Sequence, residues 1–500
     1  MIELLQIENA HTLQMLLYLR VFSHIVFTVL LGHYLILNLQ WYNYKLSRVI
    51  FKHHKKRWHI LIFLLPFVAY FFTMDFFWVF FYFTYIPLFY RWNKQLDKGL
   101  VFTQRVWRFF GYLLASSVFV HLLAFYWQIT SPQHLSLLAL AMSVVCMNLN
   151  EQIILAKYKK QAKAKLSSMQ GLQIIQITAS FGKTSIKNFT HELLKKQFNT
   201  YATPQSVNTL NGIIKDINNN LPANTQIYIA ESGAREKNDI LQITKLLEPH
   251  YVVLGKIGTA HLEYFKTQEN ITNTKLEIIQ SSRIKKAYIH KDNIFNEAQK
   301  GQILPLSPIY YPNNLQIKEA SLYGTDFSLE LEGIQEAFST PLLGSFNPEN
   351  ISVALLLAKE FGVATPSLHT SVQNLSFVPH RLQKIQNGDK LIIDDSFNAN
   401  FEGMSEAIRL CSSYKGRKII VTCGLIESSE EENIALAQKI DAVFQIVVIT
   451  GERNKELLST HIIKAQKFIL EDKSKMEQFL STLTQSSDMI LFANDAPSHI

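Results

Sequence analysis

The pattern of apolar positions divides this chain of 500 residues into two parts. Before about residue 155, apolar residues form long runs at 14–39, 58–90, 106–128 and 134–155. After residue 170 they form short runs, some spaced as strands and some as helices. Long runs are typical of helices surrounded by apolar material, whereas short alternating runs are typical of a soluble α/β protein.

The long runs predict membrane-spanning helices. Because about 20 apolar residues cross a bilayer once, the run 58–90 is long enough only for a hairpin that leaves and returns. The segments 45–57, 91–108 and 156–165 are rich in Lys and Arg, which places them on the cytoplasmic side. We therefore expect about five crossings in a multi-pass protein of the inner (cytoplasmic) membrane, with everything after 156 in the cytoplasm. Re-entrant or interfacial packing of 58–90 is the alternative.

The net charge and the cysteine content further narrow the class of protein. The net charge of +9 lies largely beside the apolar runs, which favours the lipid bilayer as a partner over nucleic acid. Arg20 and Asp75 fall inside those runs, where ionisable groups indicate function by default. Snorkelling of Arg20 and a hairpin-tip position for Asp75 are the favoured interpretations. The three cysteines form no CxxC pair, so neither a zinc ribbon nor a disulfide framework is indicated.

A candidate phosphate-binding loop follows the membrane region. Residues 172–178 have the composition of a buried strand, 179–185 of a short loop, and 186–198 of a helix. A Gly-Lys-Thr loop between a strand and a helix is the context in which backbone N–H groups hold phosphate oxygens. Lys183 would neutralise the β- and γ-phosphates, and the Thr184 hydroxyl would bind Mg²⁺. The usual earlier glycine is missing, since residue 177 is Ile.

The loop sequence Thr-Ala-Ser-Phe-Gly-Lys-Thr-Ser at 178–185 resembles the shorter phosphate loop of the Mur ligases, T-G-S-x-G-K-T-[ST]. Three later segments continue the resemblance: Thr-Pro-Gln-Ser-Val-Asn-Thr at 203–209, Ile-Gly-Thr-Ala-His-Leu-Glu at 257–263, and Asp-Asp-Ser-Phe-Asn-Ala-Asn at 394–400. The first and the third are similar to segments of the members that add D-alanyl-D-alanine to the muramoyl tripeptide, and the second is similar to a segment of the family as a whole. The resemblance covers about 170–500 and fails over 1–155.

The resemblance implies a set of site residues. ATP would be bound by Ser180, Gly182, Lys183, Thr184, Ser185, Asn350, Arg381 and Asp395, and Mg²⁺ by Thr184, Glu231 and His261. Lys183, His261 and Lys275 would be catalytic, with Lys275 carried as a carbamate. The substrate would be bound by Asn208, Thr209, Asn398 and Asn400.

Two positions depart from the family pattern. Ala179 replaces a glycine of the loop, which would cost on the order of 1 kcal/mol if that backbone position needed a positive φ. Phe346 stands where the family usually has histidine, in the stretch Gly-Ser-Phe-Asn-Pro-Glu-Asn at 344–350. We expect that nucleotide contact to be lost or replaced by stacking.

The implied architecture is α/β, with N-terminal transmembrane helices, a P-loop central domain and a Rossmann-like C-terminal domain. The expected boundaries are 1–155 for the membrane region, 156–170 for a basic linker helix, 171–378 for the central ATP-binding domain and 379–500 for the C-terminal domain. The implied activity is ATP-dependent addition of D-alanyl-D-alanine to UDP-N-acetylmuramoyl-tripeptide through an acyl phosphate, forming ADP and phosphate. Two alternatives remain: the same chemistry on another, lipid-linked carboxylate, and a non-catalytic membrane scaffold with a degenerate nucleotide fold.

Overall fold

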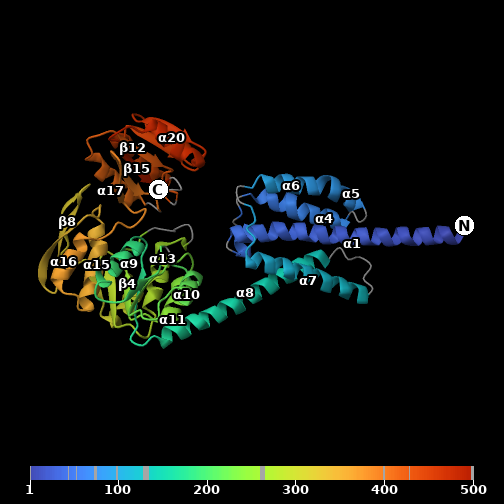
Figure 1. Ribbon diagram of the computed structural model, residues 1–500, viewed down its shortest axis with the longest axis horizontal. Helices are drawn as coiled ribbons and strands as arrows, with labels where there is room; N and C mark the ends of the chain where they lie inside the picture. The colour runs from blue at the N-terminus through green and yellow to red at the C-terminus, as the bar shows by residue number, and fades with distance from the viewer. Residues whose placement is uncertain are drawn as a thin grey trace. The chain divides into compact units, whose positions relative to one another are not determined.

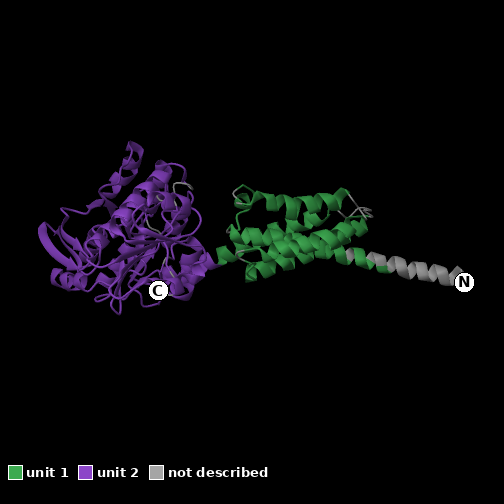
Figure 2. Cartoon of the chain, turned by 90° about the horizontal axis from the view of Figure 1, so that it is seen from above, with its two compact units in different colours: residues 1–157 green, residues 158–500 purple. Residues whose placement is uncertain are grey.

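The chain forms two compact units, residues 1–157 and 158–500 (Figure 2). The structure is a computed structural model, which describes residues 2–42, 44–51, 53, 55–72, 76–96, 99–127, 135–205, 207–258, 265–397, 400–426 and 428–496. Asp75, His261 and Asn398 lie outside the described residues.

The first unit is helical. Its elements are α1 (Ile2–Trp41), α2 (Leu46–Phe51), α3 (Lys56–Trp58), η1 (His59–Leu64), α4 (Leu65–Phe72), α5 (Phe77–Phe80), η3 (Phe81–Tyr85), α6 (Ile86–Lys94), α7 (Gln104–Tyr126) and α8 (Leu135–Ser168). The segment predicted as a hairpin runs from α3 to α6. Ring contacts between Trp58 and Trp92 at one end and between Tyr70 and Phe77 at the other show that its two arms are antiparallel.

Three helical stretches are long and apolar enough to cross a membrane, judged by length and composition alone: Tyr18–Trp41, Gln104–Tyr126 and Leu135–Ser168. Neither arm of the hairpin is among them in the described part of the chain. Each arm is divided by a π-helical turn, η1 in one and η3 in the other. Phe77, Phe81 and Tyr85 are fully buried in the core of the unit, so much of the apolar content of the hairpin serves internal packing.

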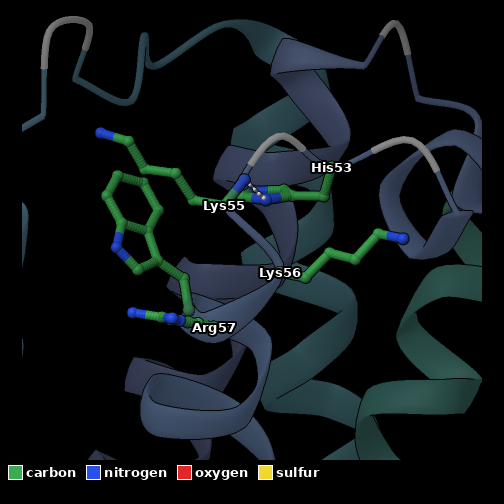
Figure 3. A pocket seen from close by; sticks show the side chains of 5 residues that line it. His53, Lys55, Lys56 and Arg57 are labelled. Atoms are coloured by element: carbon green, nitrogen blue, oxygen red, sulfur yellow. Dashed lines mark hydrogen bonds between the residues drawn. The ribbon is translucent and has the colours of Figure 1, made fainter.

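A shallow basic pocket lies where the hairpin begins (Figure 3). Lys55 and Arg57 extend to one side of it and Lys56 to the other. The backbone N–H of Lys55 donates to Nδ1 of His53 at 3.0 Å. The Lys55 ammonium lies 4.5 Å from the ring centroid of Trp58. None of these residues belongs to the phosphate-loop site described below.

The second unit begins with the end of α8, so the expected linker helix 156–170 is not a separate element. Lys165 Nζ, near the end of α8, donates to the carbonyl of Ile217 at 2.7 Å. Lys163 pairs with Glu248 at 2.8 Å. The basic residues of this segment therefore bind the surface of the α/β fold, which explains why the helix continues past residue 156.

The central domain is built on a parallel sheet in the order β2-β3-β1-β4-β5-β6. The strands are β1 (Gln173–Thr178), β2 (Thr200–Ala202), β3 (Ile227–Glu231), β4 (Tyr251–Leu254), β5 (Lys286–His290) and β6 (Ile309–Tyr311). Its strands read as nearly continuous apolar runs because both faces are covered. One face carries α9 (Lys183–Leu194), α15 (Asn347–Glu360) and α16 (Thr365–Gln373), and the other carries α10 (Leu210–Asn219), α11 (Asp239–Leu247) and α13 (Gln268–Leu276) (Figure 1).

A three-stranded antiparallel sheet, β7 (Gln316–Ser321), β8 (Gly324–Leu331) and β9 (Ile334–Thr340), precedes α15. Its inward-facing Phe327 and Phe338 join the same core as α9 and α15. The sequence analysis did not predict this sheet, although β8 alternates between buried and more exposed positions over part of its length.

The C-terminal domain is a second six-stranded sheet, in the order β10-β11-β15-β12-β13-β14. Its elements are β10 (Gln383–Asn387), β11 (Lys390–Asp395), α17 (Phe401–Ser412), β12 (Lys418–Thr422), α18 (Glu430–Val443), β13 (Ile446–Thr450), α19 (Lys455–His461), β14 (Gln466–Leu470), α20 (Met476–Leu483) and β15 (Met489–Ala493). All neighbours pair in parallel except β10 and β11. The predicted α/β architecture of both domains is confirmed.

Candidate active site at the phosphate-binding loop

The loop 179–182 joins β1 to α9 at the carboxyl edge of the central sheet, where ligands bind in open parallel sheets. Gly182 has φ of +78° and caps α9, so the helix begins at Lys183, three residues earlier than predicted. A Cβ added at Gly182 would collide with the side chain of Asn350 on α15. Position 182 therefore requires glycine for two reasons: the positive φ, and the lack of space for a side chain beside Asn350. Ala179 is not among the positive-φ residues, so the predicted strain is not present.

The Lys183 ammonium lies within the turn of the loop. Nζ donates to the carbonyl of Ala179 at 2.9 Å and to that of Ser180 at 3.1 Å. Burial lowers the pKa of Lys183, the charge of Glu231 opposes this shift, and Arg381 adds to it. Ser180 is itself fixed, because its Oγ donates to the carbonyl of Gly258 at 3.2 Å.

Glu231 ends β3, the strand next to β1, and faces the start of α9. Parallel pairing places it in register with Ile177, two residues before the loop begins at Ala179. Its Oε2 accepts from the Thr184 hydroxyl at 2.9 Å, and its Oε1 accepts from Nδ2 of Asn208 at 3.0 Å. A buried carboxylate beside a threonine hydroxyl is a set of hard oxygen donors, which suits Mg²⁺. The residues therefore fit the predicted cation.

Lys275 reaches the same loop from α13. Its side chain is buried, and Nζ donates to the carbonyl of Ala179 at 2.8 Å. Burial lowers the pKa of Lys275 well below its ordinary value, and the neighbouring charge of Lys183 lowers it further. The amines of Lys183 and Lys275 therefore share one carbonyl acceptor, that of Ala179.

Arg381 and Asp395 come from the start of the C-terminal domain. The guanidinium of Arg381 lies over the ring of Phe397, 4.9 Å from its centroid, and interacts with the charges of Asp395 and Glu231. Asp395 ends β11 and accepts from the backbone N–H of Leu382 at 3.2 Å. Burial raises the pKa of Asp395 to about 6, although Arg381 opposes the shift. An arginine of the second domain thus interacts with the carboxylate beside the phosphate loop.

Several predicted contact residues also have structural roles. Thr209 accepts from the N–H of Gly212 and caps α10, and Asn400 accepts from the N–H of Gly403 at 2.7 Å and caps α17. Ser185 is buried in the first turn of α9. Phe346 packs against the core of the C-terminal domain, which accounts for an aromatic residue where histidine is usual.

Lys187 is part of this cluster and was missed by the sequence analysis. It is fully buried in α9 and lies 3.5 Å from Oε2 of Glu231. Its spacing of four residues from Lys183, on the same face of a helix, was the available signal.

The fold and the site define the class of protein. A Gly-Lys-Thr loop at the carboxyl edge of a parallel sheet, with a buried carboxylate on the adjacent strand, is the arrangement that holds nucleotide phosphates and a divalent cation. The second α/β domain adds an arginine to the same region. The second unit, residues 158–500, is therefore a P-loop protein of two α/β domains.

The chain belongs to the Mur ligase family. Residues 177–358 match the Mur ligase middle domain, and residues 380–494 match the glutamate ligase domain of Mur ligases. Members of this family are ATP-dependent ligases. The resemblance found in the motifs is thereby confirmed.

Two curated relatives of similar sequence have the same enzyme name as each other. The UDP-N-acetylmuramoyl-tripeptide--D-alanyl-D-alanine ligase of Bacillus subtilis is 27% identical over 351 residues, which cover 68% of this chain and 76% of the relative. That of Escherichia coli is 24% identical over 278 residues, or 53% of this chain and 61% of the relative.

Solved structures agree on the fold. A crystal structure of MurF from Acinetobacter baumannii has a TM-score of 0.59 at 21% identity and covers 69% of this chain and 78% of its own. MurF ligase from Thermotoga maritima in complex with ADP has a TM-score of 0.57 at 24% identity and covers 68% and 80%.

The predicted location as a multi-pass protein of the inner membrane is wrong. The relatives are soluble cytoplasmic ligases, and the three apolar helices are candidate spans by length and composition only. Part of the physical reason lies in the first unit, where Phe27, Phe77 and Phe81 of the apolar runs fill a protein core. The apolar windows of Gln104–Tyr126 and Leu135–Ser168 are 33% and 22% buried. The prediction of a lipid bilayer as partner depends on the same runs and stays a prediction.

Proposed function

We propose that the chain is an ATP-dependent ligase that adds D-alanyl-D-alanine to UDP-N-acetylmuramoyl-tripeptide in peptidoglycan precursor synthesis. The observation that carries the proposal is the meeting of Lys183, Thr184 and Glu231 with Arg381 of the second domain at one sheet edge. The names of the curated relatives supply the substrates.

In the first step, the tripeptide carboxylate attacks the γ-phosphorus of ATP, forming an acyl phosphate and releasing ADP. Lys183 and Arg381 neutralise charge that spreads over the phosphate oxygens in the transition state. Thr184 and Glu231 would hold Mg²⁺, which supplies further neutralisation of the phosphates when bound. His261 is proposed as a further cation ligand, and Ser180, Gly182, Ser185, Asn350 and Asp395 as further nucleotide contacts.

In the second step, the amine of D-alanyl-D-alanine attacks the acyl carbon, the amide bond forms, and phosphate leaves with the electron pair of the broken C–O bond. Water would hydrolyse the acyl phosphate, so the second domain must cover the site while the intermediate exists. Asn208, Thr209, Asn398 and Asn400 are proposed to orient the substrates. Residues 171–378 and 379–500 are the proposed boundaries of the two catalytic domains.

Lys275 is proposed to act as a carbamate. Its buried amine has a pKa well below the ordinary value, so the neutral form that reacts with CO₂ is favoured. The product is an anion, which suits a site that already contains Lys183 and a cation.

The proposal is tested by phosphate release from the purified chain with ATP, Mg²⁺, UDP-N-acetylmuramoyl-tripeptide and D-alanyl-D-alanine. We expect release to require both acceptor substrates and to fall roughly 100-fold or more in Lys183→Met, because a charge stabilising the transition state is lost. The matched control is Lys195→Met, at the surface end of the same helix, where Lys195 pairs only with Glu192 in the contacts described.

Equal release in the Lys183→Met variant, or release that ignores the tripeptide, would contradict the proposal. Release that requires a different carboxylate would instead indicate a ligase of another substrate. No release with any acceptor would indicate a non-catalytic scaffold.

A further inference from the structure

Lys187 is a charged side chain that the reaction as described does not use. It lies one turn beyond Lys183 in α9 and is fully buried. Burial lowers its pKa, while the charge of Glu231 opposes this shift. A buried ammonium is costly unless its charge and its N–H groups have partners, so the partners of Lys187 are informative.

Those partners belong to two different segments. Nζ lies 3.5 Å from Oε2 of Glu231 and also donates to the carbonyl of Gln205. Gln205 stands in the segment 203–209, with a φ of +44°. The same segment also contacts Glu231 directly. Asn208 donates to Oε1 of the Glu231 carboxylate, and the Thr203 hydroxyl accepts from the backbone N–H of Glu231 at 3.2 Å.

The carboxylate of Glu231 is thus held from two sides. Thr184 and Lys187, both on α9, contact Oε2, whereas Asn208 contacts Oε1. Only Lys187 contributes a charge to this set at close range. If that charge were removed, the two neutral donors would remain, and the charges that act on the carboxylate would be those of Lys183 and Arg381.

We propose that Lys187 is a positioning residue that fixes the Glu231 carboxylate beside Thr184 and ties the segment 203–209 to it. The inference rests on the proposed function in taking this carboxylate as a ligand of the cation that accompanies the nucleotide. Lys187 does not touch the phosphates itself; it acts through Glu231. Substitutions of such supporting residues typically weaken metal affinity by about 10–100-fold.

The test is calorimetric titration of ADP into the full-length protein over a range of Mg²⁺ concentrations. Lys187→Gln removes the charge and keeps a donor for the Gln205 carbonyl, Lys187→Arg keeps the charge, and Lys195→Met is the surface control. We expect Lys187→Gln to raise the Mg²⁺ concentration needed for half-maximal ADP uptake by about 10–100-fold. Lys187→Arg should recover part of this loss, and Lys195→Met should match the wild type.

A double-mutant cycle separates positioning from general damage to the fold. In a Glu231→Gln background, where the carboxylate is already lost, Lys187→Gln should add less than about 2-fold to the Mg²⁺ requirement. An equal increment in both backgrounds would overturn the inference, as would an unchanged Mg²⁺ requirement in Lys187→Gln. Thermal melting of each variant identifies any that fail to fold, in which case Lys187→Arg alone must show an intermediate requirement.

The outcomes for this inference and for the proposed function are distinct. ADP uptake needs neither tripeptide nor D-alanyl-D-alanine, so a Lys187 effect without ligase activity supports the inference and rejects the function. Wild-type protein that takes up no ADP at any Mg²⁺ concentration would reject both.

Discussion

At the scale of single residues, Lys275 is a buried lysine beside the phosphate loop. Its amine is buried, donates to the Ala179 carbonyl, and has a pKa well below that of an exposed lysine. A neutral amine adds CO₂ by forming an N–C bond and losing a proton, which converts a cationic position into an anionic one. This reversal of charge would turn a repulsion between Lys275 and Lys183 into an attraction.

The residue-scale prediction concerns that carbamate. In the presence of ¹³C-bicarbonate, the wild-type protein should give a carbamate carbon signal by NMR that is absent from Lys275→Gln. Phosphate release by the variant should fall roughly 10–100-fold, as expected for loss of a residue that supports a metal site. Identical spectra from the two proteins would reject the carbamate.

The sequence predicted part of the site at this scale. Lys183, Thr184, Glu231 and Lys275 meet around the loop where the motifs placed them, although their roles remain predictions. Lys187 was missed because a lysine in a helix is usually exposed, and its burial arises only when β3 and the segment 203–209 pack against α9. Sequence spacing contains no information on that packing.

At the scale of elements, the junction between β1 and α9 depends on one glycine. Gly182 combines a φ of +78° with close approach of the Asn350 side chain, whereas Gly171 has a φ of +76° with nothing near its missing Cβ. The two positions therefore share a left-handed φ, which glycine adopts without strain, and differ in their surroundings.

The element-scale prediction compares substitutions at Gly182 and Gly171. Gly182→Ala and Gly171→Ala should each lower the free energy of unfolding by about 1–2 kcal/mol, because alanine is strained at left-handed φ. Only Gly182→Ala should also weaken ADP binding, since its methyl group displaces Asn350. Urea unfolding and calorimetry measure the two effects, and equal loss of ADP binding in both variants would contradict the account of the loop.

Strand positions were predicted better than helix ends. β1 begins one residue after the start of the predicted strand 172–178 and ends with it, because continuous burial on both faces gives a strong signal. The start of α9 was placed three residues late, since Gly182 caps the helix through its backbone conformation and no side chain marks the position. The sheet β7-β8-β9 went unpredicted because β7 and β9 are largely exposed and alternate only weakly between buried and exposed positions.

At the scale of the whole molecule, the fold class was predictable and the cellular location was not. Hydropathy measures how strongly a side chain favours an apolar environment over water. It does not show whether that environment is a protein core or a bilayer. Phe27, Phe77 and Phe81 illustrate the difficulty, because all three lie in apolar runs and are fully buried against protein. The boundaries predicted for the domains remain predictions.

The two catalytic domains contact one another within the second unit. The N–H of Ser345 donates to Oε1 of Glu406 at 2.8 Å, and the Lys384 ammonium donates to the carbonyl of Leu322 at 2.9 Å. Arg381 lies close to this junction, so the proposed transfer of phosphate depends on how the domains meet. At this scale we propose that the chain joins a carboxylate to an amine through an acyl phosphate.

Isotope transfer tests that claim most directly. The tripeptide carboxylate is labelled with ¹⁸O, and the phosphate released during amide formation is analysed by mass spectrometry. Attack of the carboxylate on ATP predicts one ¹⁸O atom in phosphate for each amide bond formed, because the C–O bond of the acyl phosphate breaks when the amine attacks. Phosphate without label, formed while the amide product accumulates, would contradict the account.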